Sequence, residues 1–350
     1  MNRMMLGSAA VGLGVAVALW RRRQTFDLRG KVVLITGGSR GLGLALARGF
    51  AQEGARLVLC ARELSELQAA QEDLARWTSD VIIVPCDVSD CEQVEFLIEA
   101  AVRDYGRIDV LVNNAGIIQV GPIQTMTLED FDRAMEVIFW GTVHPTLAVL
   151  PDMLERGDGR IVNITSVGGK VSVPHLLPYS CAKFAAVAFS EGLRSELHGS
   201  GVKTITIAPG LMRTGSFLNA EFKGDDEREA AWFSVSASLP GPSMSAVRAA
   251  RQIISATKRG TAEKILSLPA NLIALMHGVM PGLTADVLGL VNRALPQGRG
   301  EGSRPMRSVL PRKRLLNALT ALGQRAAHQH LQSDSDRATS EIPHESAVLS

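Results

Sequence analysis

The chain has 350 residues, of which 46% are hydrophobic and 21% are charged, and its formal net charge is +2. This composition excludes global disorder, and the near-neutral charge gives no indication of nucleic-acid binding, which is typical of strongly basic domains. The cysteines Cys60, Cys86, Cys91 and Cys181 are scattered without a CxxC pair. We therefore expect reduced thiols, with neither a disulfide framework nor a metal site.

The N-terminal segment, residues 1–24, contains an uncharged apolar run at 4–20 that is followed directly by Arg21, Arg22 and Arg23. The run is at the lower limit of length for a helix that spans a bilayer, and arginines directly beyond it are typical of a membrane boundary. We expect an uncleaved single-pass anchor that leaves the rest of the chain in the cytoplasm. A cleaved signal peptide and a membrane-surface or buried segment are the alternatives.

Short apolar runs alternate with amphipathic helical patterns through the middle of the chain. The runs are the expected strands, at residues 32–35, 57–59, 81–84, 110–112, 161–162 and 204–207. Runs this short and this apolar suit strands that are buried on both faces. The alternation predicts an α/β fold over residues 28–262, with a Rossmann-like, doubly wound parallel sheet and helices on both faces.

A glycine-rich loop follows the first expected strand, and a helical pattern follows the loop. Its sequence is Thr36-Gly37-Gly38-Ser39-Arg40-Gly41-Leu42-Gly43. Strand, glycine loop and helix in this order are the context that a dinucleotide-binding fingerprint requires. The glycines let the backbone approach a pyrophosphate, and the helix N-terminus supplies N–H groups with partial positive charge.

The charges near this loop favour NADP(H) over NAD(H). NAD-binding folds place a carboxylate about 20 residues beyond the loop, on the ribose hydroxyls. Here the second expected strand ends at Arg62 without a carboxylate, and Arg40 lies within the loop. Two guanidinium groups suit the 2′-phosphate of NADP(H), and two solvated arginines are the alternative.

One helix face and one strand end carry candidate acid–base residues. Tyr179 and Lys183 stand four residues apart at the start of a helical pattern, so they share a face. A nearby ammonium lowers the pKa of a phenol, which lets Tyr179 exchange a proton with a substrate oxygen. Ser166 closes an expected strand, where open α/β sheets bind their ligands.

These motifs together resemble those of the short-chain dehydrogenase/reductase (SDR) family. The matching features are the TGxxxGxG loop at 36–43, Asn113-Asn114-Ala115-Gly116, the set Ser166, Tyr179 and Lys183, and Pro209-Gly210 followed by Thr214. The resemblance covers about residues 28–214 and extends to about residue 262. It also implies a homo-oligomer, because family members often associate through the helix that bears the tyrosine and the lysine.

The resemblance implies a role for each matching residue. Tyr179 is the general acid/base, Lys183 binds the nicotinamide ribose and lowers the pKa of Tyr179, and Ser166 polarises the carbonyl. Asp87 contacts the adenine, with a helix cap or loop residue as the alternative, and Asn114 lines the cofactor groove. The expected cofactor-binding residues are Thr36, Gly37, Ser39, Arg40, Gly41, Leu42, Gly43, Arg62, Asp87, Asn114, Ala115, Gly116, Tyr179, Lys183, Pro209, Gly210 and Thr214.

One position departs from the family's pattern. Ile138 stands where the family carries an asparagine that supports a water-linked proton relay to the lysine. An isoleucine side chain cannot hydrogen-bond such a water. The relay is therefore expected either to be arranged differently or to be impaired.

The segment at residues 211–242 corresponds to the substrate loop of the family. It contains Phe217, Phe222, Trp232 and Phe233 among charged residues. These aromatic side chains are expected either to contact substrate from a mobile lid or to pack in the core.

The last two segments are expected to lie outside the catalytic domain. Residues 265–285 carry no charge, but Pro269 and Pro281 bracket a short helical pattern there. We expect 263–296 to form an apolar helical flap that covers the active site or contacts a membrane surface, with a second spanning helix as the alternative. Residues 297–350 are expected to form a basic, largely disordered tail, with a short membrane-surface helix as the alternative.

The leading function is that of an NADP(H)-dependent oxidoreductase that interconverts a carbonyl and an alcohol. An anchor together with an apolar flap indicates a lipophilic substrate. One alternative is a membrane-associated protein of the same fold that binds NADPH without turnover, which Ile138 favours. Another is a nucleotide-sugar epimerase or dehydratase, although such relatives usually carry TGxxGxxG rather than TGxxxGxG.

Overall fold

The computed structural model of the chain describes residues 25–239, 241, 243–296, 298, 303–305 and 314–332. The expected anchor at residues 1–24 lies outside these residues. Much of the expected tail, beyond residue 296, lies outside them as well.

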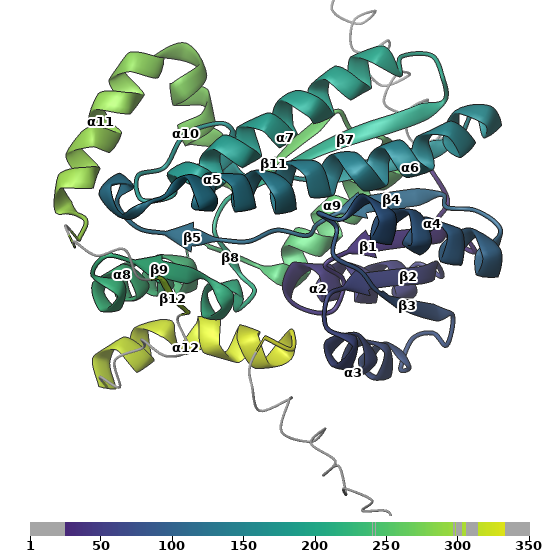
Figure 1. Ribbon diagram of the computed structural model, residues 1–350, viewed down its shortest axis with the longest axis horizontal. Coiled ribbons are helices and arrows are strands. Elements are labelled where there is room, and N and C mark those ends of the chain that lie inside the picture. Colours follow the sequence, from purple (N-terminus) through teal and green to yellow (C-terminus); the bar gives the residue numbers. More distant parts are fainter. Residues whose placement is uncertain are drawn as a thin grey trace, which may run out of the picture.

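A parallel sheet of seven strands forms the centre of the described structure, in the order β11-β7-β6-β4-β1-β2-β3 (Figure 1). The strands are β1 (Val32–Thr36), β2 (Arg56–Ala61), β3 (Val81–Pro85), β4 (Val110–Asn113), β6 (Gly159–Ile164), β7 (Val202–Pro209) and β11 (Glu263–Leu266). The strand order reverses between β1 and β4, which makes that point the topological switch of a doubly wound sheet. The predicted Rossmann-like α/β fold is confirmed.

Helices cover both faces of this sheet. On one face lie α2 (Gly41–Gln52), α3 (Leu64–Leu74) and α9 (Ala246–Arg259), and on the other lie α4 (Cys91–Tyr105), α6 (Gly141–Arg156) and α7 (Leu177–Glu196). Successive strand residues point to opposite faces, so Leu57 and Leu59 enter the first core while Val58 and Cys60 enter the second. Two buried faces explain why the strands are continuous apolar runs.

One continuous helical run, Leu128–Arg156, is long and apolar enough to cross a membrane among the residues that the structure describes. It consists of α5 (Leu128–Ala134), the π-helix η2 (Met135–Trp140) and α6. Of the apolar 18-residue stretch within this run, 44% is buried inside the protein. The last turns of the run pack Met153 into the second core. This packing is that of a core helix which covers the sheet.

The end of the domain and the structure of the tail differ from the sequence-based expectation. The domain was expected to end at residue 262, but β11 pairs with β7 at Thr206–Pro209 and completes the sheet. Glu263 and Lys264 make β11 polar, and an edge strand tolerates this because one side of it has no neighbour. The tail was expected to be largely disordered, but its residues Arg314–Gln329 form the helix α12.

The substrate side of the molecule is built from short elements that follow β7. They are β8 (Met212–Arg213), η4 (Ser216–Asn219), β9 (Glu221–Lys223), α8 (Asp226–Ser238) and β10 (Met244–Ser245). A small sheet places β9 between β5 (Gln119–Val120) and β12 (Ser303–Pro305). Figure 1 shows α12 running beside α8 toward α2, and it shows α10 (Leu268–Val279) and α11 (Pro281–Ala294) as a hairpin that stands away from the sheet.

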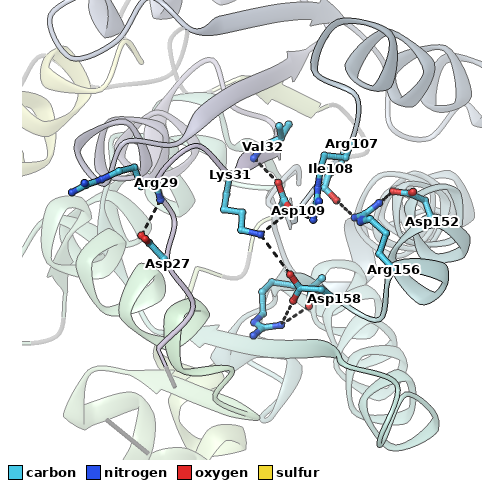
Figure 2. A network of polar contacts seen from close by, with 12 residues as sticks. Asp27, Arg29, Lys31, Val32, Arg107, Ile108, Asp109, Asp152, Arg156 and Asp158 are labelled. Atoms are coloured by element: carbon cyan, nitrogen blue, oxygen red, sulfur yellow. Dashed lines mark hydrogen bonds and ion pairs between the residues drawn. The ribbon is translucent and has the colours of Figure 1, made fainter. Parts of the chain in front are cut away.

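A polar network ties the amino ends of the strands together, at the edge opposite the glycine loop (Figure 2). Asp109, directly before β4, accepts the backbone N–H of Val32 at 2.9 Å. Its other oxygen lies 3.3 Å from Lys31 Nζ and 2.5 Å from Arg107 Nη2. The buried carboxylate therefore joins the start of β1 to the start of β4, far from the catalytic edge.

Candidate active site

A cavity of about 610 Å³ opens at the carboxyl edge of the sheet. Residues from the glycine loop, from the ends of β2, β3, β4, β6 and β7, and from α7 and α8 line it. The predicted residues among them are Gly37, Ser39, Arg40, Leu42, Arg62, Asp87, Asn114, Ala115, Gly116, Ser166, Tyr179, Lys183, Pro209, Gly210 and Thr214. The structure thus brings together nearly all residues that the sequence assigned to the site.

Thr36, Gly41 and Gly43 are the predicted residues that are not part of the cavity lining. Thr36 Oγ1 accepts the backbone N–H groups of Asn114 at 2.9 Å and Ala115 at 3.1 Å. A Cβ at Gly43 would collide with the carbonyl oxygen of Gly37, so only glycine lets α2 start this close to the loop. These residues hold the loop in shape behind the cavity.

The glycine loop and the first turn of α2 fit a dinucleotide. The first N–H groups of a helix have no partner within it, and they carry partial positive charge. The cavity reaches this turn at Leu42 and extends past Asn114 and Gly116 to Lys183. One continuous cavity therefore offers backbone donors for phosphates at one end and the candidate catalytic residues at the other.

A carboxylate stands beside the arginines that sequence reasoning assigned to a 2′-phosphate. Glu66 Oε1, on α3, lies 2.7 Å from Arg40 Nη1, and Ser39 Oγ donates to Glu66 Oε2 at 3.2 Å. Glu63, Glu66 and Arg62 all line the cavity. These carboxylates make the charge around Arg40 and Arg62 less positive than the two guanidinium groups alone would give.

Tyr179 lies partly buried in the first turn of α7, close to the side chain of Ser166. Ser166 follows β6, and its Oγ accepts the backbone N–H of Gly168 at 2.9 Å. Removal of the phenol from water raises the pKa of Tyr179, and the nearby Ser166 hydroxyl opposes that rise. We expected Lys183 to lower this pKa, but in the described structure the desolvation of the phenol outweighs the influences that lower it.

Lys183 lies one helical turn beyond Tyr179 and is almost completely buried. Its Nζ donates to the carbonyl oxygen of Ile164 at 2.9 Å and lies 5.8 Å from the centroid of the Tyr179 ring. Burial lowers the pKa of Lys183 to about 8, because the ammonium is removed from water without a carboxylate partner. The charge on this lysine is therefore sensitive to pH near the physiological range.

Ile138 lies on the π-helix η2 and is 1% exposed. It packs in a small apolar cluster with Ala134 and Ala182, against which Tyr179 also lies. Its carbonyl oxygen accepts the hydroxyl of Thr142 at 2.7 Å. The position where the family carries an asparagine side chain is therefore an apolar wall.

The aromatic residues of the substrate loop divide between the two alternatives. Phe217 and Phe222 are fully buried in a core cluster that also contains Phe233 and against which Trp232 packs. Trp232 and Phe233 line the cavity as well. Ser267, Pro269, Ala270 and Ile273 bring the start of α10 to the cavity wall. This part of the expected flap borders the site.

A buried polar set behind Trp232 was missed by sequence reasoning. Glu229 Oε2 accepts the indole N–H of Trp232 at 2.6 Å, and Glu229 Oε1 lies 2.7 Å from His175 Nδ1. His175 has a left-handed backbone (φ 63°), although it is not glycine. The contact between His175 and Glu229 joins residues 54 positions apart, so no local motif in the sequence indicates it.

The comparisons with known proteins agree with this geometry. The family model described as short chain dehydrogenase matches residues 31–223. The chain belongs to the short-chain dehydrogenase/reductase family. Members of this family are oxidoreductases that use a nicotinamide cofactor, either NAD or NADP.

Individual relatives cover much of this SDR chain. It is 41% identical to "Dehydrogenase/reductase SDR family protein 7-like" of Anopheles gambiae over 204 residues, which is 57% of this chain and 64% of the relative. It is 32% identical to "Dehydrogenase/reductase SDR family member 7B" of Bos taurus over 271 residues, which is 75% of this chain and 82% of the relative. The match to the Anopheles protein thus spans less than two thirds of that protein's length.

A solved structure shares the fold of this SDR chain. A short-chain dehydrogenase from Streptomyces avermitilis superposes with a TM-score of 0.64 at 30% sequence identity. The match covers 76% of this chain and 98% of the bacterial protein. The residues beyond that match are additions to the shared fold.

Proposed function

We propose that the chain is an NADP(H)-dependent oxidoreductase that interconverts a carbonyl and an alcohol on a lipophilic substrate, with Tyr179 as the general acid/base. The observation that carries this proposal is that one cavity brings together the side chains of Ser166, Tyr179 and Lys183. Hydroxyl, phenol and ammonium groups in this order can hold a carbonyl oxygen and move one proton to it.

The bound nicotinamide would supply the hydride that the substrate carbon gains or loses. In the reductive direction, Ser166 donates a hydrogen bond to the carbonyl oxygen and Tyr179 gives it the phenolic proton. Burial raises the pKa of Tyr179 and so keeps the phenol protonated, which is the form that a reduction needs. The ammonium of Lys183 then stabilises the phenolate that remains. Oxidation uses the same groups in reverse.

The preference for NADP(H) rests on the arginines at the end of β2 and in the glycine loop. Arg62 lines the cavity, and Arg40 does so beside Glu66. We expect Arg62→Ala to weaken NADPH binding about tenfold, or ~1.4 kcal/mol, and to leave NADH binding nearly unchanged. Isothermal titration with both cofactors measures this ratio. Equal weakening of the two would contradict the preference.

The two sides of helix α10 support the proposals of a lipophilic substrate and of membrane association. Its first turns border the cavity through Pro269, Ala270 and Ile273, while Leu272 and Leu275 are exposed outward. Further exposed apolar side chains continue along the hairpin, at Val279, Met280, Leu283, Val287, Leu290 and Val291. An exposed apolar surface of this extent favours contact with a lipid phase. We propose that it acts with an N-terminal single-pass anchor and that the catalytic domain faces the cytoplasm.

Homo-oligomerisation is also part of the proposal. Leu147 and Leu154 on α6 and Phe184 on α7 are exposed apolar residues of neighbouring helices. Paired helices of this kind suit a two-fold interface between copies of the chain. Light scattering with Leu147→Glu beside the wild type tests it, because a charge at the interface should give monomers.

The test of the reaction is NADPH oxidation, followed at its near-ultraviolet absorbance with a panel of lipophilic ketones and aldehydes. Tyr179→Phe should lose at least about a hundredfold in rate, because it removes the proton that is transferred. Tyr105→Phe is the matched control, since Tyr105 is the other tyrosine and stacks on Arg56 away from the cavity.

A fully active Tyr179→Phe protein would refute the mechanism. A wild type that binds NADPH but oxidises none across the panel would favour the second candidate, a cofactor-binding protein without turnover. The apolar wall at Ile138 is the observation that supports this candidate.

A further inference from the structure

The C-terminal helix α12 packs closely on the substrate side of the cavity. Gly323 of α12 lies against Ser238 and Phe217, where a Cβ would collide with the Ser238 hydroxyl. Gly215 has a left-handed backbone (φ 79°), and a Cβ there would collide with Ala327 of α12. This close approach needs glycine on both sides, so α12 is seated on η4 and α8 rather than loosely attached.

The chain turns sharply at the end of α12. The backbone N–H of Gln332 donates to the Ala327 carbonyl at 2.8 Å, and that of Leu331 donates to the His328 carbonyl at 3.4 Å. These are the two hydrogen bonds of a Schellman motif, and Leu331 takes the left-handed conformation (φ 52°) that glycine usually takes. A leucine in this conformation is strained, and the contacts beyond the turn must offset that strain.

Those contacts lie on the first turns of α2. The carbonyl oxygen of His330 accepts the backbone N–H of Gly41, the first residue of α2, at 2.8 Å. The carbonyl oxygen of Gln329 accepts Arg48 Nη1 at 2.8 Å, and His330 Nδ1 lies 3.4 Å from the same nitrogen. We call residues 330–332 the C-terminal strap, because they connect the substrate side to the glycine loop.

The last residue of the strap reaches the cavity. Gln332 is 5% exposed and lines the cavity beside Ser39, Arg40, Leu42 and Thr214. Its Oε1 accepts the Asn219 side-chain N–H, which orients the carboxamide. Its Nε2 is then the end that faces Gly41, where a Cβ would collide with it.

We propose that the C-terminal strap forms the outer wall of the pyrophosphate subsite and that Gln332 is a cofactor-binding residue whose carboxamide N–H group donates to the dinucleotide phosphates. Among the described residues, the strap accepts the Gly41 N–H, and the N–H groups of Leu42 and Gly43 lie at the helix N-terminus, where a phosphate can accept them. Burial and the nearby Arg48 lower the pKa of His330 to about 4, so the strap adds no histidine charge at neutral pH. The inference rests on the nicotinamide dinucleotide of the family, and it depends neither on turnover nor on a preference for NADP(H).

Equilibrium binding of NADPH to the full chain tests this inference without any substrate. Energy transfer from tryptophan to NADPH gives the dissociation constant, and thermal unfolding verifies that each variant folds. Gln332→Ala should bind NADPH about five- to tenfold more weakly, and Gln332→Glu more weakly still, because a carboxylate would face the phosphates. Gln329→Ala is the matched control, since this glutamine ends the same helix with its side chain exposed.

Unchanged binding by folded Gln332→Ala would overturn the inference. Tighter binding by that variant would overturn it as well, because it would show that the strap competes with the phosphates for α2. Since no substrate is present, a wild type that fails to turn over leaves the result unaffected.

Discussion

Lys183 allows a quantitative prediction about stability. Its ammonium is buried, and burial lowers its pKa from 10.5 to about 8 in the folded, cofactor-free chain. A difference of about 2.5 pKa units corresponds to about 3 kcal/mol at 1.36 kcal/mol per unit. The unfolded chain binds more protons than the folded chain between pH 8 and 10.5, so the free energy of unfolding rises with pH in that window.

Lys183→Met removes the buried charge but also the hydrogen bond to the Ile164 carbonyl. The first change should stabilise the folded chain by about 3 kcal/mol at pH 7, and the second should offset about 1–2 kcal/mol of that. A net gain of about 1–2 kcal/mol is expected, although the variant should be inactive. The wild type should recover about 1 kcal/mol between pH 7 and pH 9, and the variant should not.

Urea unfolding of both proteins at pH 7, 8 and 9, without cofactor, measures the difference. Unfolding free energies that run parallel over this range would refute the reasoning, because the buried charge would then not set the pH dependence. A variant that is less stable than the wild type at pH 7 by several kcal/mol would refute the magnitude.

Two further substitutions separate stability from catalysis. Asp109→Asn should lower the free energy of unfolding by about 1–3 kcal/mol, because it removes the ion pairs with Lys31 and Arg107. Its affinity for NADPH should stay unchanged, because Asp109 lies at the sheet edge opposite the cavity. A changed affinity in a titration would contradict this separation of the two sheet edges. Ile138→Asn should lower the free energy of unfolding by about 2 kcal/mol, because it buries an amide beside Ala182. The same substitution should raise kcat with little effect on KM. A lower kcat would show that the apolar wall is part of the working site.

The elements that could be predicted from the sequence are those determined by local pattern. Strands β1, β2, β3, β4, β6 and β7 contain continuous apolar runs, because helices bury both of their faces. β11 could not be found in this way, since an edge strand tolerates the charges of Glu263 and Lys264.

In the candidate site, too, the residues in local motifs could be predicted and the contacts between distant segments could not. Its glycine loop, Ser166, Tyr179 and Lys183 form motifs with fixed spacing, and the structure brings them to one cavity. The Arg40–Glu66 ion pair joins two elements, and Gln332 reaches the loop from the far end of the chain. Contacts of this kind depend on packing between distant segments, so no pattern within either segment predicts them.

Helix α10 borders the cavity on one side and exposes Leu272 and Leu275 on the other. A single helix is about 10 Å thick, so under the proposed membrane contact a substrate would travel about that distance from the lipid to the cavity wall. For a substrate dissolved in lipid, the quantity that governs occupancy is its mole fraction in that phase rather than its concentration in water. Diluting such a substrate with inert lipid would therefore slow the reaction even though the total amount of substrate in the vessel stays the same.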